Sequence, residues 1–212
     1  MKDAKTFWDK SAPRYAKSRI RDEQAYQKKL AITQGYFRPD WSVLEFGCGT
    51  GGTAIIHAPH VGHILATDIS DTMLDIAGQR AREAGVDNIS FQQGTLESLE
   101  LAAESFDAVL GLNVLHLLDD LDAALARVHG VLKPGGIFVS STALVGDIAV
   151  FWRLLIPLMQ RLGLAPYVNR LGRQQLVAGL TKAGFRIEHQ WQPGRGAVFI
   201  VASKGTAGLH TG

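Results

Sequence analysis

Cysteine is nearly absent from this sequence, and neither sign of charge prevails. Cys48 is the only cysteine, which excludes a disulfide bond within the chain and fits a reducing compartment. The chain has 22 basic and 20 acidic residues, and the formal net charge of +2 is too small to indicate a nucleic-acid partner. The basic residues are also scattered, without the interleaved aromatic residues of a nucleic-acid-binding stripe. We therefore expect no nucleic-acid partner.

Long uncharged hydrophobic runs are missing as well. No segment reaches the length of a membrane span without charges, and residues 1–5 precede no apolar signal core. We therefore expect a cytoplasmic protein with no integral membrane association. The 212 residues, 46% of them hydrophobic, suffice for one domain with a sizeable core. We place this domain at residues 1–204 and a flexible tail at residues 205–212.

A cluster of glycines follows the apolar residues 43–46, which are typical of a strand covered on both faces. Glycine lets the backbone turn tightly and approach a ligand without a Cβ in the way. Gly47, Gly49 and Gly51 form a Gly-x-Gly-x-Gly pattern. Gly47, Gly49 and Gly52 also match the dinucleotide-binding spacing Gly-x-Gly-x-x-Gly. The glycines alone indicate a nucleoside ligand and leave its class open.

Two acidic residues accompany the glycines. Glu45 lies two residues before Gly47, and Asp68 ends a second strand-like run, residues 64–68. Asp68 follows Gly47 by about twenty residues, the distance at which an acidic side chain can accept hydrogen bonds from both hydroxyls of a ribose. The sequence therefore predicts a ribose-binding carboxylate at Asp68.

Apolar periodicity predicts strands that alternate with helices over most of the chain. We expect strands at residues 43–46, 64–68, 89–93, 106–112, 137–141, 185–191 and 197–203. We expect helices at residues 53–57, 70–84, 121–132 and 169–183, with Ser70 as an N-cap, and an N-terminal helical region, residues 4–37, that breaks at Pro13. The last two strands have a tight link and should pair antiparallel. Residues 133–136 are expected to be a bare turn.

Taken in order, the blocks at residues 43–52, 64–68, 105–110, 113–116 and 131–136 resemble the class I S-adenosylmethionine-dependent methyltransferases, of the small-molecule, methyltransferase type 11-like kind. The resemblance covers roughly residues 7–203. It implies an α/β, Rossmann-like fold: a seven-stranded, mostly parallel sheet with an antiparallel last strand and helices on both faces. It also implies S-adenosyl-L-methionine as cofactor, S-adenosyl-L-homocysteine as product, and in-line methyl transfer to a small, lipophilic acceptor.

The resemblance implies a set of cofactor-binding residues. Ile69 and Met73 would flank the adenine, although core packing is the alternative explanation of both. Thr95 stands where the family usually has an aspartate for the adenine amino group, which puts that contact in doubt. The implied set is Tyr15, Glu45, Gly47, Cys48, Gly49, Thr50, Gly51, Asp68, Ile69, Met73, Gly94, Thr95, Leu96 and Asn113.

Two residues are candidates for a catalytic role. His116 follows the fourth strand, where a base would act on an acceptor that arrives protonated, and the alternative is a residue that only caps the next helix. Tyr15 belongs to residues 1–38, which resemble an N-terminal helical lid, and the alternative is simple packing on the sheet. Cys48 is a poor nucleophile candidate because a small residue between glycines is usually there for its size.

Residues 146–170 hold an apolar helical insertion that Pro157 should kink. A helix apolar on all sides is buried, lies at an interface or lines an apolar cavity. We expect it to cover the acceptor pocket, with Phe151 and Trp152 binding the substrate. A homodimer interface is the alternative.

Three histidines, His57, His60 and His63, recur at regular intervals. Pro59 and Gly62 interrupt any continuous helix that would present them together. We expect solvated loop histidines and no metal site.

Three other functions share parts of this pattern. A protein of the same fold could use the nucleoside for another reaction, such as aminopropyl transfer, or bind it as a regulatory subunit without turnover. A nicotinamide oxidoreductase would share the glycine spacing but conflicts with the antiparallel C-terminal pair.

Overall fold

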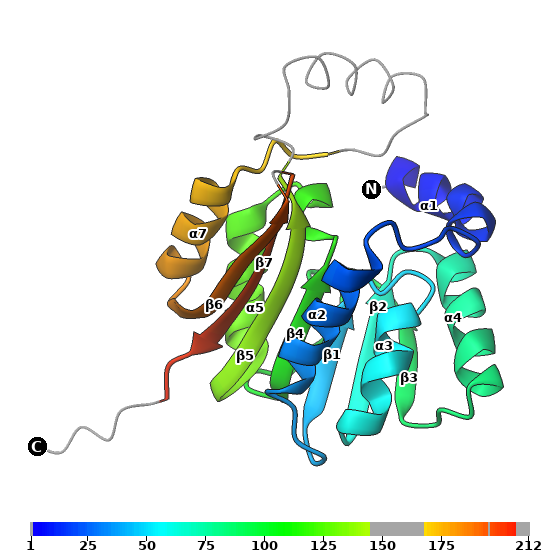
Figure 1. Ribbon diagram of the computed structural model, residues 1–212, viewed down its shortest axis with the longest axis horizontal. Helices are drawn as coiled ribbons and strands as arrows, with labels where there is room; N and C mark the ends of the chain where they lie inside the picture. The colour runs from blue at the N-terminus through cyan, green and yellow to red at the C-terminus, as the bar shows by residue number, and fades with distance from the viewer. Residues whose placement is uncertain (1, 145–167, 195, 207–212) are drawn as a thin grey trace, which may run out of the picture.

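The computed structural model describes residues 2–144, 168–194 and 196–206, and a seven-stranded sheet is its centre (Figure 1). The strand order is β3-β2-β1-β4-β5-β7-β6. Neighbouring strands are parallel except that β7 runs antiparallel to both β5 and β6. The predicted fold class is therefore confirmed. The strands are β1 (Ser42–Phe46), β2 (His63–Asp68), β3 (Ile89–Gln93), β4 (Phe106–Leu112), β5 (Leu132–Ala143), β6 (Phe185–Gly194) and β7 (Ala197–Lys204).

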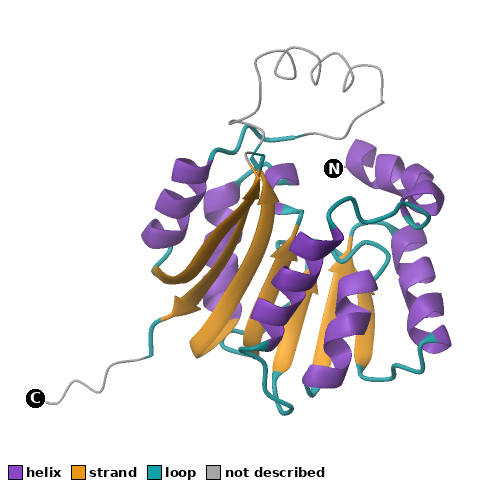
Figure 2. Cartoon of the chain, viewed as in Figure 1, coloured by secondary structure: helices purple, strands orange, loops and turns teal. Residues whose placement is uncertain are grey.

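Helices cover both faces of the sheet and enclose two cores (Figures 1 and 2). Leu125 and Val128 pack with Phe138 on the face covered by α5 and α7, while Ala54 and Ile64 belong to the core of the other face. The central strands are buried on both sides, which explains why their sequences are apolar without alternation. The helices are α1 (Lys2–Tyr15), α2 (Glu23–Gln34), α3 (Gly52–His57), α4 (Asp71–Glu83), α5 (Leu121–Val131) and α7 (Arg173–Lys182), with 3₁₀ turns η1 (Ala58–His60) and η2 (Leu115–Leu117).

The predicted break at Pro13 is wrong. Pro13 lies within α1, and the turn still closes because the Ala16 amide donates to the Ala12 carbonyl at 2.9 Å. A proline in the last turn removes only one bond of a helix that is about to end. The interruption follows Tyr15 instead, and α2 begins after the N-cap Asp22, whose Oδ1 accepts the Ala25 amide at 2.9 Å.

Two further boundaries differ from the prediction. The last helix begins at Arg173 and not at Asn169, because its N-cap Gly172 has an extended backbone, with φ −102° and ψ 160°. The Asn169 amide donates to the His116 carbonyl at 2.7 Å. Residues 133–136 are part of β5 and carry an ion pair, since Lys133 Nζ lies 2.8 Å from Asp107 Oδ2. This segment is therefore not a bare turn.

His57 is not the solvated loop residue that the sequence suggested. It is 1% exposed, packs edge-on against Phe37, and has Gln34 Nε2 3.4 Å from its Nδ1. Burial, with the His60 charge, lowers the His57 pKa to about 4. His60 and His63 are exposed, as predicted, but His63 begins β2 and His60 ends η1, so they are not loop residues. Within the described ranges, no group of three or more His, Cys, Asp or Glu side chains is placed to hold a metal ion.

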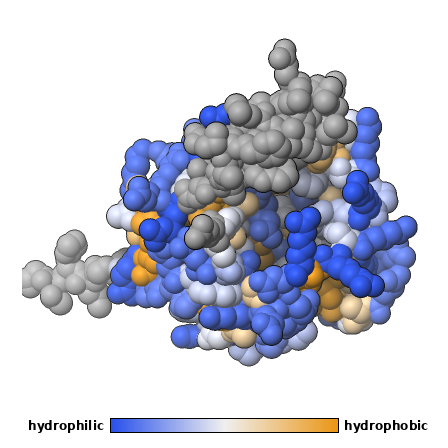
Figure 3. Space-filling view, turned by 45° about the horizontal axis from the view of Figure 1, so that its top comes forward, coloured by the Kyte–Doolittle hydropathy of each residue, from blue (hydrophilic) through white to orange (hydrophobic). Residues whose placement is uncertain are grey.

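Hydrophobic residues form small, separate patches among hydrophilic ones in the view of Figure 3. None of the described helices is long and apolar enough to span a bilayer. Most of the predicted insertion at residues 146–170, including Phe151 and Trp152, lies outside the described residues, as does most of the predicted tail.

Candidate active site

The glycine loop between β1 and α3 needs glycine at three alternating positions. Gly47, Gly49 and Gly51 have φ angles of 65°, 55° and 73°, in the left-handed region that side chains disfavour. A Cβ on Gly47 would lie 2.6 Å from Val114 Cγ2, and one on Gly51 would lie 2.8 Å from Ala77 Cβ. A Cβ on Gly52 would meet nothing within 4 Å. The backbone therefore requires the Gly-x-Gly-x-Gly pattern, and the dinucleotide spacing through Gly52 is incidental.

Asp68 organises this loop from the end of β2. Its Oδ2 accepts the Gly49 amide and its Oδ1 accepts the Ser70 amide, both at 2.9 Å. Burial raises the pKa of the Asp68 carboxyl, and these backbone hydrogen bonds oppose the shift. The same carboxylate thus holds the loop and the start of α4, where Ser70 Oγ caps the helix by accepting the Met73 amide at 3.1 Å, as predicted.

Glu45 is a buried acid beneath the loop. It is 2% exposed, and its Oε2 has no hydrogen-bond partner among the described residues. Burial raises its pKa to about 8. A buried carboxyl oxygen without a partner costs free energy, which a cationic or N–H donor from a ligand would recover.

Helix α1 is held against α4 at two points, near its middle and just beyond its C-terminus. Asp9 Oδ1 accepts the Ser70 hydroxyl at 2.6 Å, and Asp9 Oδ2 lies 2.8 Å from Lys5 Nζ, contacts that lower the Asp9 pKa to about 2. At the second point, Arg80 of α4 donates to the Ala16 carbonyl at 2.6 Å and to Thr50 Oγ1 at 2.7 Å. The loop, α4 and α1 are thereby one hydrogen-bonded unit.

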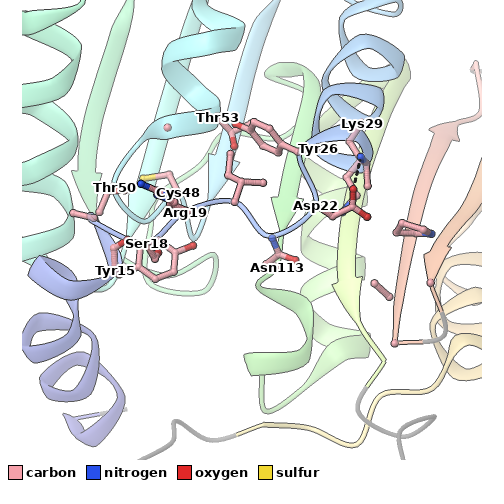
Figure 4. Close-up of a pocket in the computed structure, with 18 of the residues that line it drawn as sticks. Tyr15, Ser18, Arg19, Asp22, Tyr26, Lys29, Cys48, Thr50, Thr53 and Asn113 are labelled. Atoms are coloured by element: carbon pink, nitrogen blue, oxygen red, sulfur yellow. Dashed lines mark hydrogen bonds between the residues drawn. The ribbon is translucent and has the colours of Figure 1, made fainter.

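A cavity of about 630 Å³ opens beside this unit (Figure 4). Its size is that of small-molecule sites in proteins. In Figure 4, Tyr15 and Thr50 lie at one end, Asp22 and Lys29 at the other, and Asn113 and Tyr26 between them. The walls come from α1, α2, the segment between them, the glycine loop, the start of α3, Arg80, the end of β4 and the turn between β6 and β7.

Four predicted cofactor residues line the cavity: Tyr15, Cys48, Thr50 and Asn113. Tyr15 is 48% exposed, and its Cε1 lies 3.6 Å from where a Cβ on Gly49 would be. Asn113 has a φ of 58°, unusual for a non-glycine residue, and its amide donates to the Ser141 carbonyl at 2.6 Å.

The other predicted contacts lie outside the cavity lining. Met73 and Leu96 are 2% and 3% exposed, so their side chains pack in the interior. Ile69 is partly buried, and Gly94 follows β3 with its amide bonded to the Asp68 carbonyl at 3.0 Å. Thr95 Oγ1 accepts the Ser98 amide at 3.2 Å and so caps its own turn.

His116, the predicted base, lies in η2 and is not among the residues that line the cavity. Its Nδ1 is buried without a hydrogen-bond partner among the described residues. Burial lowers the His116 pKa, which favours the neutral ring that a base requires.

Sequence analysis missed the contribution of α2 to the cavity. Asp22, Tyr26 and Lys29 recur at intervals of four and three residues, which places them on one helical face, and all three line the cavity. In Figure 4 the Tyr26 side chain lies near that of Thr53, at the start of α3. The helical spacing of these polar residues was the available signal.

Comparison with known proteins shows a similarity to methyltransferases. Residues 43–136 match the model of a methyltransferase domain family. The chain is 35% identical to the uncharacterized methyltransferase YcgJ of Bacillus subtilis over 123 residues, 56% of this chain and 49% of that protein. It therefore spans about half the length of this relative. It is 28% identical to the demethylmenaquinone methyltransferase of Symbiobacterium thermophilum over 189 residues, 82% of this chain and 73% of that one.

Solved structures share the fold. The YcgJ crystal structure superposes with a TM-score of 0.71 at 21% identity, covering 85% of this chain and 100% of that one. A geranyl diphosphate C-methyltransferase from Streptomyces coelicolor, in complex with S-adenosyl-L-homocysteine, has a TM-score of 0.73 at 16% identity, covering 86% and 79%. The match over residues 43–136 and the shared sheet, with its single antiparallel strand between β5 and β6, make this chain similar to methyltransferases in sequence and in fold.

Proposed function

We propose that this chain transfers the methyl group of S-adenosylmethionine to a small acceptor held in the 630 Å³ cavity. The observation that carries the proposal is the glycine loop, which leaves no room for a Cβ at Gly47 or Gly51, beside a buried and unpartnered Glu45 carboxyl. A glycine loop that follows a parallel strand, with an acidic group beneath it, fits a nucleoside that carries an amino group.

The residues present fit this cofactor. Glu45 would accept from the amino group of the methionine moiety, which would supply the partner that Oε2 lacks. Asp68 would accept from the ribose hydroxyls with the lone pairs that Gly49 and Ser70 leave available. When bound, S-adenosylmethionine supplies a methyl group on a positively charged sulfur.

The protein then has to align the acceptor and exclude water. Alignment alone can contribute up to about 10 kcal/mol. Tyr15 and the segment that follows it form the wall over the loop and would keep water from the reacting atoms. No protein nucleophile is needed, and burial raises the Cys48 pKa well above its usual value, so this thiol stays protonated.

The proposal also includes the chemical class of the methyl acceptor. Two of the similar proteins are named for their substrates, demethylmenaquinone and geranyl diphosphate, and both of these molecules carry a hydrocarbon portion. Tyr15, Ile20 and Tyr26 supply apolar surface to the cavity of this chain. We propose a small acceptor with a lipophilic portion, which Phe151 and Trp152 would help to bind.

His116 is proposed as the base for an acceptor that arrives protonated. Its neutral ring suits the role, and η2 follows the end of β4, where the acceptor would approach. If it acts so, His116→Gln lowers kcat by about a hundredfold and leaves cofactor affinity unchanged. Equal turnover in the variant would remove His116 from the mechanism.

The test has two stages. First, titration calorimetry with S-adenosylmethionine and S-adenosylhomocysteine should show one site per chain, and the absence of binding would overturn the proposal. Second, methyl-labelled cofactor incubated with the protein and extracts of polar and lipophilic metabolites should label a small molecule. Binding without any labelled product would instead favour a regulatory cofactor-binding protein.

A further inference from the structure

Lys29 lies at the end of the cavity away from the ribose carboxylate. Its Nζ donates to Ser141 Oγ at 2.9 Å, near the end of β5. Asp68 ends β2, and the order β2-β1-β4-β5 puts three strand spacings, about 14 Å, between these two strands. Because the glycine loop and Asp68 define the nucleoside end, Lys29 belongs to the acceptor end.

The Lys29 ammonium has few hydrogen-bond partners for a half-buried cation beside a cavity. An ammonium has three N–H donors, and among the described residues Lys29 makes one hydrogen bond, to the neutral Ser141 hydroxyl, and no ion pair. Burial lowers the Lys29 pKa, and the charge of Asp22 only partly opposes this shift. The Asp22 carboxylate caps α2 through the Ala25 amide and forms no ion pair with Lys29.

The other polar groups of the cavity wall are less suited than Lys29 to bind an anion at this end. Two other cations line the cavity: Arg19, which lies near Cys48 and Thr50 at the opposite end in Figure 4, and Arg80, which is occupied by Thr50 and by the Ala16 carbonyl. Asn113 is held at the end of β4 by its bond to the Ser141 carbonyl, so Ser141 positions both Asn113 and Lys29 on the cavity wall. A half-buried cation with donors to spare beside a cavity is a site for an anion.

We propose that Lys29 binds an anionic oxygen group of the methyl acceptor, a carboxylate or a phosphate. That the anion belongs to a methyl acceptor rests on the proposed function. The anion site itself is inferred from Lys29 and the cavity alone. The proposal also fixes the orientation of the bound acceptor: its anionic group points toward β5 and its reacting atom faces the glycine loop. Lys29 is thus a specificity residue.

The test measures anion binding with the cofactor end filled. Protein saturated with S-adenosylhomocysteine is titrated with benzoate, inorganic phosphate and the neutral benzamide. We expect benzoate or phosphate to bind and benzamide to bind more weakly, and the comparison of the two anions tells which group the site takes. Lys29→Met should weaken anion binding by about tenfold or more, and Lys29→Arg should retain most of it.

Lys28 provides a matched control on the same helix. Its Nζ lies 4.2 Å from the centre of the Trp191 ring, and Lys28 does not line the cavity. Lys28→Met removes the same charge and should leave anion affinity unchanged. Equal losses of anion affinity in the Lys28 and Lys29 variants would show that only net charge matters and would overturn the proposal. The proposal would also be overturned if the wild-type protein binds neither anion.

Cofactor binding separates this proposal from the proposed function. Lys29→Met should bind S-adenosylhomocysteine as the wild type does, and a loss there would place Lys29 in the cofactor site and overturn its acceptor role. If the wild type does not bind S-adenosylhomocysteine, the methyltransferase proposal fails. The anion titration is then run without the nucleoside and still decides whether Lys29 binds an anion.

Discussion

Nη1 of Arg80 lies 2.7 Å from Oγ1 of Thr50, and this bond couples α4 to the glycine loop, while Nη2 holds the Ala16 carbonyl at 2.6 Å. Arg80→Met removes both contacts. We expect S-adenosylhomocysteine affinity to fall by about tenfold and limited proteolysis at residues 16–22 to accelerate, because α1 loses its fastening to the loop. Arg82→Met, which removes the same charge from an exposed position of α4, should change neither quantity. Unchanged proteolysis in Arg80→Met would contradict the coupling.

Adjacent glycines should respond differently to alanine. Gly51→Ala puts a Cβ 2.8 Å from Ala77 Cβ at a φ of 73°, and we expect a loss of about 1–3 kcal/mol in the free energy of unfolding. Gly52→Ala, with nothing within 4 Å, should cost less than about 0.5 kcal/mol or stabilise the helix start. Urea unfolding of both variants is the measurement. Equal losses would mean that the loop does not need its left-handed backbone.

Glu45 should make the ligand-free protein less stable as pH rises. Its pKa is about 8 in the folded protein against an ordinary value of 4.5, so between these pH values the folded state holds a proton that the unfolded state has released. The free energy of unfolding therefore falls from about pH 4.5 to about pH 8, by a few kcal/mol at most. Glu45→Gln should flatten this slope.

Saturating S-adenosylhomocysteine provides the second check on Glu45. If the ligand amino group pairs with the carboxylate, the ligand should stabilise the wild type more than Glu45→Gln at pH 7. Denaturant unfolding at several pH values, with and without ligand, measures both effects. A wild-type slope that Glu45→Gln leaves intact would assign the pH dependence to another group.

Asp68→Ala should weaken cofactor binding by about 1–3 kcal/mol, because ribose hydroxyls lose a charged partner. The variant also loses the Gly49 and Ser70 hydrogen bonds, so the ribose contribution needs its own readout. A 2′-deoxy analogue should bind the wild type more weakly than S-adenosylhomocysteine, and Asp68→Ala should weaken its binding by less than it weakens that of S-adenosylhomocysteine. Asp75→Asn, at an exposed position of α4, is the control. Additive losses would refute a direct ribose contact.

Local patterns in the sequence determined the elements and their order. Apolar runs identified the strands, the two C-terminal strands indicated an antiparallel pair, and Ser70 was identifiable as an N-cap, because these features depend on neighbouring residues along the chain. The ordered blocks around Gly47 and Asp68 also indicated the family. Helix ends were less predictable: Pro13 falls inside α1, and the extended backbone of Gly172 moves the start of the last helix to Arg173.

Only the tertiary structure decided which residues share the cavity. The two glycine spacings are equivalent in the sequence, and the positions of Val114 and Ala77 distinguish them because those side chains fill the space that a Cβ would need. The burial of His57 likewise depends on Phe37 and Gln34, which belong to another segment. Lys29 meets Ser141, 112 residues away, only because α2 packs across the end of β5. Such contacts arise from the packing of distant elements, which local periodicity does not encode.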